Sequence, residues 1–110
     1  PRPRGQGPAL ELTGQIDRLA VVGETVLIID YKTNRPPPRD VSGVAAVYLY
    51  QLAAYTLALR EIYPKHRVRA ALLWTDGARL MEIPQDLLDA YTTKIWDLDP
   101  RNLDAGAPRS

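Results

Sequence analysis

The chain has 110 residues, of which 45% are hydrophobic and 25% are charged, and its formal net charge is only +1. This length supplies one hydrophobic core and excludes a second independent domain. No apolar stretch approaches the roughly 18 residues that span a bilayer, which excludes an integral membrane protein, and the charge balance gives no support for a strongly basic nucleic-acid-binding domain. The chain has no cysteine, so disulfides and thiolate metal sites are excluded, and any metal must be held by oxygen or by the single histidine, His66.

The two ends of the sequence indicate a segment of a longer protein. Residues 1–12 contain arginines but lack the apolar core of a secretory signal, so we expect an intracellular location. We expect residues 1–110 to form a single domain cut from a larger chain. Residues 1–9 and 100–110 are expected to be poorly ordered.

The first predicted element is a β-hairpin. Residues 10–22 alternate loosely between apolar and polar, and residues 26–31 resume as an apolar, β-branched run. Gly23 and Glu24 separate the two runs, and a glycine at the first turn position favours a two-residue type II′ connection. Because the run from Val26 to Ile29 is apolar on both faces, we expect it to be a central strand of a sheet.

The remaining pattern predicts a helix, two strands and a second helix. Their predicted ranges are 44–63 for the first helix, 68–75 and 78–83 for the strands, and 86–98 for the second helix. Asp76-Gly77 predicts a type I′ turn between the strands. A helix between two strands of one sheet implies a crossover connection, so the predicted class is α/β, with a twisted mixed sheet flanked by helices.

Hairpin geometry places two acids beside each other. Across a two-residue turn at positions 23 and 24, facing residues have numbers that add to 47, so Asp17 faces Asp30 and Gln15 faces Lys32. Facing like charges destabilise a sheet unless a cation intervenes, and Mg²⁺ binds one or two carboxylates together with phosphate oxygens. Lys32 then lies where it can act on a bound water or stabilise a phosphoryl group.

Plainer interpretations of the same residues stay open at this point. Cross-strand ion pairs on a solvated sheet edge would also explain Asp17, Asp30 and Lys32, and a one-residue change of register would move Asp17 to the opposite face. Arg35 and Arg39, which flank three prolines, fit either a solvated linker or a loop that contacts phosphates.

Two longer runs resemble a known family: "GQIDRLAVVGETVLIIDYKTNRPPP" and "VYLYQLAAYTLAL". They are similar to the RecB-like nuclease domains of the PD-(D/E)xK superfamily, most closely to the domain at the C-terminus of AddA-type helicase-nucleases. The resemblance covers roughly residues 10–83 and includes three ordered signatures. These are Gly14 to Arg18, Asp30 to Thr33, and Gln51 with Tyr55 four residues later, preceded by Tyr48.

The resemblance implies a restriction-endonuclease-like core that hydrolyses DNA phosphodiesters. It implies Asp17, Asp30 and the main-chain carbonyl of Tyr31 as ligands of Mg²⁺, with Mn²⁺ as an alternative, and Asp17, Asp30 and Lys32 as catalytic residues. The residues that it implies as supporting or DNA-contacting are Gln51, Tyr55, Tyr48, Arg35 and Arg39.

The resemblance also implies a cellular setting. The parent protein would repair double-strand breaks in the bacterial cytoplasm, at the nucleoid, together with the partner subunit of an AddAB-type complex. ATP would be used only by motor domains of that parent, because no phosphate-binding G-x-x-x-x-G-K-[ST] run occurs here.

The sequence departs from the family pattern before the hairpin. RecB-like nucleases carry a helix there that supplies a histidine to the metal site, and we expect this N-terminal helix to be missing. His66 follows the lysine motif and cannot take that role, while Glu11, on an extended chain, would lie about 20 Å from Asp17. Weak metal binding and little cleavage by the chain by itself are therefore expected.

Two rival functions remain at this stage. One is a catalytically silent, nuclease-like module that guides DNA or docks a subunit through Arg35, Arg39 and the face of Tyr48. The other is a protein-interaction domain without a nucleic-acid role, for which the near-zero net charge is the support.

Overall fold

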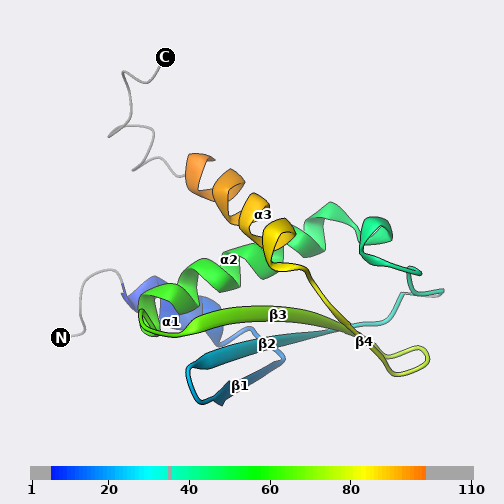
Figure 1. The fold of residues 1–110 in the computed structure, drawn as a ribbon, viewed down its shortest axis with the longest axis horizontal. Coiled ribbons are helices and arrows are strands. Elements are labelled where there is room, and N and C mark those ends of the chain that lie inside the picture. Colours follow the sequence, from blue (N-terminus) through cyan, green and yellow to red (C-terminus); the bar gives the residue numbers. More distant parts are fainter. Residues whose placement is uncertain (1–5, 35, 99–110) are drawn as a thin grey trace.

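The computed structural model describes residues 6–34 and 36–98. The elements, in chain order, are α1 (Gln6–Thr13), β1 (Arg18–Val22), β2 (Thr25–Lys32), the 3₁₀ turn η1 (Val41–Gly43), α2 (Ala46–Ile62), β3 (Arg67–Trp74), β4 (Arg79–Glu82) and α3 (Gln85–Leu98) (Figure 1). The predicted α/β class with a mixed sheet is confirmed. Among the described residues, no helix is both long and apolar enough to cross a membrane.

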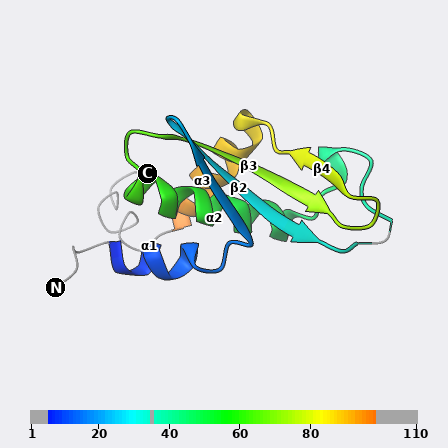
Figure 2. The same ribbon diagram turned by 90° about the horizontal axis from the view of Figure 1, so that it is seen from below.

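The four strands form one sheet in the order β1-β2-β3-β4. The outer pairs are antiparallel, whereas β2 and β3 run parallel, so the chain must cross over between them, and α2 makes that crossover. The three helices lie on one side of the sheet, and Figure 2 shows the strands from the other side. The sheet thus has one covered face and one face that no described helix covers.

Alternation along the strands builds the core against α2. The even-numbered residues of β2 and β3 point towards this helix, and Val26, Ile28, Leu72 and Trp74 are almost fully buried there. Leucines of α2 at helical spacing fill the opposite side of the core: Leu49, Leu52 and Leu59. Each such side chain contributes about 1.5–3 kcal/mol when it is buried. The core therefore fixes β2 and α2 against each other, and both carry the candidate site.

The segment before the hairpin differs from the prediction. Residues 10–13, expected to begin the first strand, belong to α1, which packs on α2 through the buried Ala9 and the half-buried Leu12. Their loose alternation fits a helix as well as a strand, and packing on α2 decides between the two. The expectation that no helix precedes the hairpin is also wrong, although α1 contains no histidine.

One predicted turn is confirmed and the other is wrong. Gly23 has φ of 60°, as the first position of a type II′ turn requires, and strand pairing runs up to Val22↔Thr25. Pairing of β3 with β4 ends at Trp74↔Arg79, which leaves a four-residue connection. The positive φ values there belong to Gly77 and Ala78, so a type I′ turn at residues 76 and 77 is excluded.

The expectations for the two ends of the chain fall largely outside the described residues. Residues 1–5 and 99–110 are not described, and residues 6–9 belong to α1.

Candidate active site

The hairpin register brings the two acids together. β1 and β2 pair as Arg18↔Ile29 and Leu19↔Ile28, so facing residues have numbers that add to 47, as predicted. One step further, Asp17 faces Asp30, and the Asp17 carboxylate accepts a 2.8 Å hydrogen bond from the Tyr31 N–H. Asp30 is only 3% exposed, whereas Asp17 is exposed to solvent. A buried and an exposed carboxylate therefore share the covered face of the sheet.

The electrostatics of this pair are asymmetric. Burial raises the pKa of the Asp30 carboxyl, and a hydrogen bond with Asp17 raises it further. That same hydrogen bond with Asp30, together with the one from the Tyr31 N–H, lowers the pKa of Asp17. Two adjacent carboxyls that share one proton show this divergence, because both cannot ionise cheaply at close range. A bound cation would relieve the repulsion.

Lys32 lies beside the acids on the same face. Its Nζ is 2.8 Å from Oδ2 of Asp30, and its side chain is only 15% exposed. The same Nζ donates a 2.9 Å hydrogen bond to Oε1 of Gln51 and lies 4.3 Å from the centre of the Tyr48 ring. Residues of α2 thus hold the amine against the carboxylate pair.

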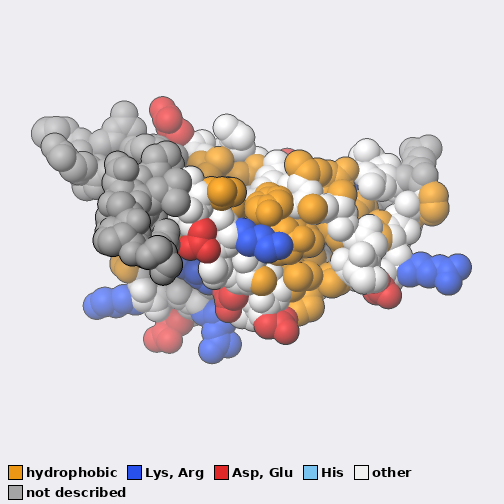
Figure 3. Space-filling view, turned by 90° about the horizontal axis from the view of Figure 1, so that it is seen from above, with side chains coloured by type: hydrophobic (Ala, Val, Ile, Leu, Met, Phe, Trp, Pro, Cys, Tyr) orange, Lys and Arg blue, Asp and Glu red, His pale blue; other side chains and the backbone are white. Residues whose placement is uncertain are grey.

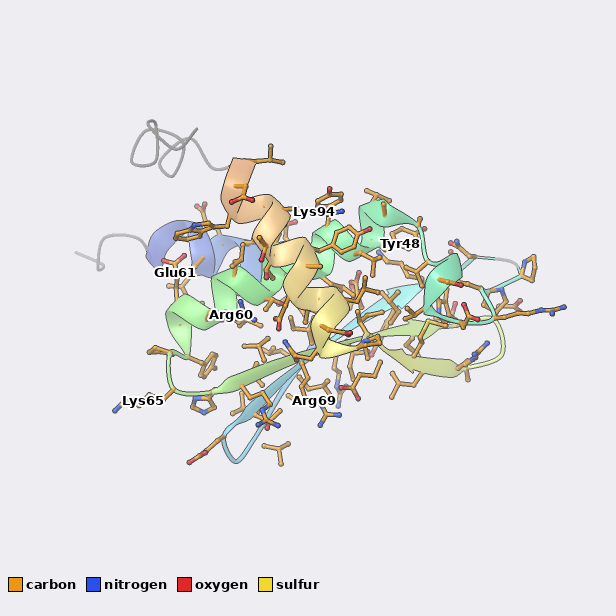
Figure 4. The ribbon with its side chains drawn as sticks, turned by 45° about the horizontal axis from the view of Figure 1, so that its top comes forward. Tyr48, Arg60, Glu61, Lys65, Arg69 and Lys94 are labelled. Carbon is orange, nitrogen blue, oxygen red and sulfur yellow. The ribbon has the colours of Figure 1, made fainter. Side chains whose placement is uncertain are left out.

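The α2 residues that the sequence singled out share one face of the helix. Tyr48 donates a 3.0 Å hydrogen bond to the Asn34 side chain and packs against Trp74 at 6.2 Å between ring centres. Figure 4 shows Tyr48 on the first part of α2, and Arg60 and Lys65 towards the far end of the molecule. Tyr48 thus contacts Asn34, Trp74 and the Lys32 amine, which fits a supporting role.

Tyr55 lies deeper than Tyr48 and Gln51. It is 2% exposed, and its hydroxyl donates a long, 3.5 Å hydrogen bond to the Gln15 carbonyl. Burial raises the pKa of Tyr55, and the negative charges of Asp30 and Asp17 raise it further. The hydroxyl thus lies near the acids but is enclosed by protein, which favours a supporting role over direct contact with DNA.

The proline-rich loop after β2 is anchored by an arginine that the sequence did not point to. Arg79 donates hydrogen bonds to the main-chain carbonyls of Pro38, at 3.1 Å, and of Arg39. The Arg39 side chain is exposed, and Arg35 lies outside the described residues. Asn34, which holds Tyr48, was also missed, although its place directly after the D-Y-K-T element was a usable signal. Arg79 is distant in sequence, so nothing local could indicate it.

The donor set fits a hard divalent cation with few protein ligands. Within residues 6–34 and 36–98, no three His, Cys, Asp or Glu side chains gather closely enough to hold a metal, so this site offers only two carboxylates. Oδ2 of Asp30 is buried, and the Lys32 ammonium lies 2.8 Å from it. Since the N–H and C=O of one strand residue point the same way, the Tyr31 carbonyl also faces Asp17. These oxygens suit Mg²⁺, which keeps several waters.

The two other candidate ligands do not join this set. Glu11 is an exposed residue of α1 rather than part of an extended strand. His66 lies just before the start of β3, where its ring packs edge-on against Tyr63 at 5.1 Å, whereas Lys32 pairs with Trp74 at the other end of that strand.

Comparison with known proteins gave one match. A sequence model described as the PD-(D/E)XK nuclease superfamily matches residues 3–106, nearly the whole chain. Neither the curated proteins nor the solved structures gave a match.

Proposed function

The chain belongs to the PD-(D/E)XK nuclease superfamily, and from this membership we propose that it hydrolyses DNA phosphodiesters with the help of Mg²⁺ or Mn²⁺. The observation that carries this proposal is the carboxylate pair of Asp17 and Asp30 with the Lys32 amine 2.8 Å from the buried member. The two acids repel each other when both are ionised, and a bound divalent cation would offset that repulsion.

Each residue of the site then has a chemical role. Asp17, Asp30 and the Tyr31 carbonyl hold the ion. A divalent cation at this place supplies Lewis-acid polarisation of the phosphate and neutralises charge that develops on it. Lys32 donates to a phosphoryl oxygen or to the attacking water, and stabilises the negative charge of the transition state. Gln51 and the Tyr48 ring keep the Lys32 amine directed at that position.

Arginines of the proline-rich loop would hold the DNA backbone. Arg39 is exposed and lies on the connection that leaves β2 after Lys32, and Arg35 lies on the same connection in the sequence. Phosphate contacts of this kind give affinity without base specificity and make that affinity depend on salt. This matches a nuclease that degrades DNA of any sequence.

The wider setting remains part of this proposal and rests on the motif resemblance. We place the chain in an AddA-type helicase-nuclease that acts in double-strand break repair in the bacterial cytoplasm, with ATP used by motor domains and with a partner subunit. Without a histidine ligand, the chain by itself is expected to bind metal weakly.

A docking module is the second candidate, and exposed apolar side chains favour it. Figure 3 looks onto the helical side, where hydrophobic side chains gather over the middle of the molecule. The exposed large apolar residues of α2 and α3 are Val47, Trp96 and Leu98, and those on the uncovered sheet face are Val22, Tyr31 and Leu80. A silent module would bind DNA or a subunit without using the carboxylates.

Cleavage assays on the full-length protein separate the two candidates. A nuclease is expected to cleave linear duplex DNA with Mg²⁺ or Mn²⁺, and to stop when EDTA removes the ion. A guiding module would show DNA binding that weakens steeply with salt, does not respond to Mg²⁺ and is never followed by cleavage. That second result would reject the proposed function.

Replacing Gln51 with alanine is expected to slow cleavage by about 10- to 100-fold, because the Lys32 amine loses its neutral acceptor and its fixed position. The measurement is kcat on duplex DNA. Gln85→Ala is a matched control, since the Gln85 side-chain amide on α3 donates a 3.0 Å hydrogen bond to Asp89 and takes no part in the site. Equal rates for both variants would contradict the role given to Gln51.

A further inference from the structure

The proline-rich loop that follows β2 is hydrogen-bonded to β4, the edge strand of the sheet. Arg79 is the first residue of β4, and its guanidinium reaches the carbonyls of Pro38 and Arg39, about forty positions earlier in the chain. We propose that Arg79 is a positioning residue that fixes this loop, so that Arg39 is presented to a DNA backbone phosphate. The inference rests on the proposed nuclease function and deepens it.

The composition of the loop explains why an arginine is needed. Pro36, Pro37 and Pro38 have no N–H, so the main chain of this run can form hydrogen bonds only through its carbonyls. Donors from elsewhere must therefore supply the anchor. Arginine offers several N–H groups in a rigid planar fork and can serve two neighbouring carbonyls at once, which the single ammonium of lysine cannot do in the same geometry.

The remainder of the loop is built to hold one shape. Asp40 accepts a 3.0 Å hydrogen bond from the Ser42 N–H and caps η1. Gly43 lies so close to Pro38 that an added Cβ would stand 3.1 Å from the proline Cβ. These contacts are within the loop itself, so they shape it without attaching it to the sheet. Arg79 provides the attachment to β4.

The backbone before Arg79 is held in an uncommon conformation. Ala78 has φ of 52° and Gly77 has φ of 91°, and Ala78 is the one non-glycine residue with positive φ among those described. An alanine in the left-handed region is unfavourable, since its Cβ approaches the carbonyl oxygen. This conformation lies at the residue that leads directly into Arg79, the first residue of β4.

The anchored loop joins the two elements that make the site. It begins after Lys32 at the end of β2 and leads through η1 into α2, which carries Tyr48 and Gln51. The catalytic groups have contacts of their own, described above, so loss of the anchor should leave them in place. Arg39 has its main-chain carbonyl held by Arg79 while its side chain remains exposed. Loss of the anchor should therefore weaken DNA binding more than it slows the chemical step.

Limited proteolysis and DNA kinetics on the full-length protein test the inference. Trypsin cleaves after Arg39, and the carbonyl of that bond is the one that accepts from Arg79. In Arg79→Ala, we expect trypsin to cut there about tenfold faster without DNA. Trypsin cleaves the loop when it opens locally, and in this variant opening does not require the two hydrogen bonds from Arg79 to be broken. We expect KM for duplex DNA to rise about tenfold while kcat changes less than about twofold.

Two further variants make the test specific. Arg69→Ala is the control: it removes an arginine of β3 that binds Glu82 through two hydrogen bonds, at 2.7 and 2.5 Å, and is expected to change neither readout. Arg79→Lys keeps the charge but not the fork, and is expected to leave Arg39 as open to trypsin as the alanine variant does. Full restoration of DNA affinity by lysine would mean a direct charge contact and would overturn the positioning role.

The remaining outcomes are also decisive. Unchanged trypsin cleavage in Arg79→Ala overturns the inference whatever the DNA kinetics show. Faster cleavage with unchanged KM, in a protein that cuts DNA, overturns the link to substrate. If the wild-type protein neither binds nor cleaves DNA, the proposed function fails and the DNA part of this inference fails with it, whereas the proteolysis result still decides whether Arg79 anchors the loop.

Discussion

Replacing Lys32 with methionine is expected to lower the rate of DNA cleavage by about 10²- to 10⁴-fold and to leave DNA affinity within about threefold. Methionine keeps most of the length and apolar volume of the stem but removes the charged donor. The amine lies 2.8 Å from Asp30 and 2.9 Å from the Gln51 oxygen, so it is directed at the acids rather than at solvent. Single-turnover cleavage and DNA binding, measured in parallel, separate the chemical step from affinity.

A second lysine in the chain supplies the control. Lys94 on α3 lies 4.6 Å from the Tyr91 ring centre, a setting similar to that of Lys32 over Tyr48. Lys94→Met therefore removes a cation–π contact and a charge away from the acids, and should leave cleavage unchanged. In a helicase-nuclease parent, DNA unwinding should survive both substitutions. If Lys32→Met cleaved within tenfold of the wild-type rate, the catalytic role of Lys32 would have to be abandoned.

The hairpin half of the site could be predicted from the sequence because it depends on local rules. Once Gly23 fixes a two-residue turn, the register follows by arithmetic, and side-chain alternation puts Asp17, Asp30 and Lys32 on one face. No folding information beyond the turn is needed for this step. Which helix covers that face depends on tertiary packing, which these local rules do not predict. Gln51 was assigned to the site from the motif resemblance and not from geometry.

The features that were missed depend on contacts between distant residues. The segment from Leu10 to Thr13 carries a pattern compatible with both helix and strand, and its contact with α2 decides in favour of helix. The Asp76-Gly77 pair is a strong local turn signal, yet pairing of Trp74 with Arg79 moves the positive φ values one residue on. Arg79 was missed for the same reason, since its acceptors lie about forty positions away.

The two acids are expected to have the same effect on activity and opposite effects on stability. Asp17→Asn and Asp30→Asn should each lower metal-dependent cleavage by about 10²- to 10⁴-fold, because each would remove one of the two carboxylates that the described residues offer to the proposed metal site. In the folded protein the pKa of Asp30 is raised and that of Asp17 is lowered, so their ionised forms contribute to the free energy of unfolding with opposite signs.

For Asp30, the fold favours the protonated form. The stability that this gives is fully present below the ordinary pKa of an aspartate, 3.8, and is lost as pH rises through the elevated folded value. At pH 7 and without metal, the ionised, buried carboxylate is therefore destabilising, and its neutral isostere should raise the thermal midpoint. For Asp17, the ionised form is favoured, so its contribution is present above pH 3.8 and is lost as pH falls through the lowered value. Asp17→Asn should lower the midpoint at pH values just above 3.8, where Asp30 still holds the proton that the pair shares.

Thermal unfolding in EDTA, just above pH 3.8 for Asp17→Asn and at pH 7 for Asp30→Asn, measures this contrast, and repetition at pH 7 with Mg²⁺ measures the effect of the ion. A cation that binds only the folded state raises its stability, so the wild-type midpoint should rise with Mg²⁺ while both variants respond little. Asp89→Asn is a suitable control, because Asp89 is an exposed acid that pairs with Arg60 at 3.0 Å, away from the site. If Asp30→Asn proved less stable than wild type in EDTA, burial of its charge would not be the dominant effect. If both variants still gained stability from Mg²⁺, the ion would have to bind elsewhere.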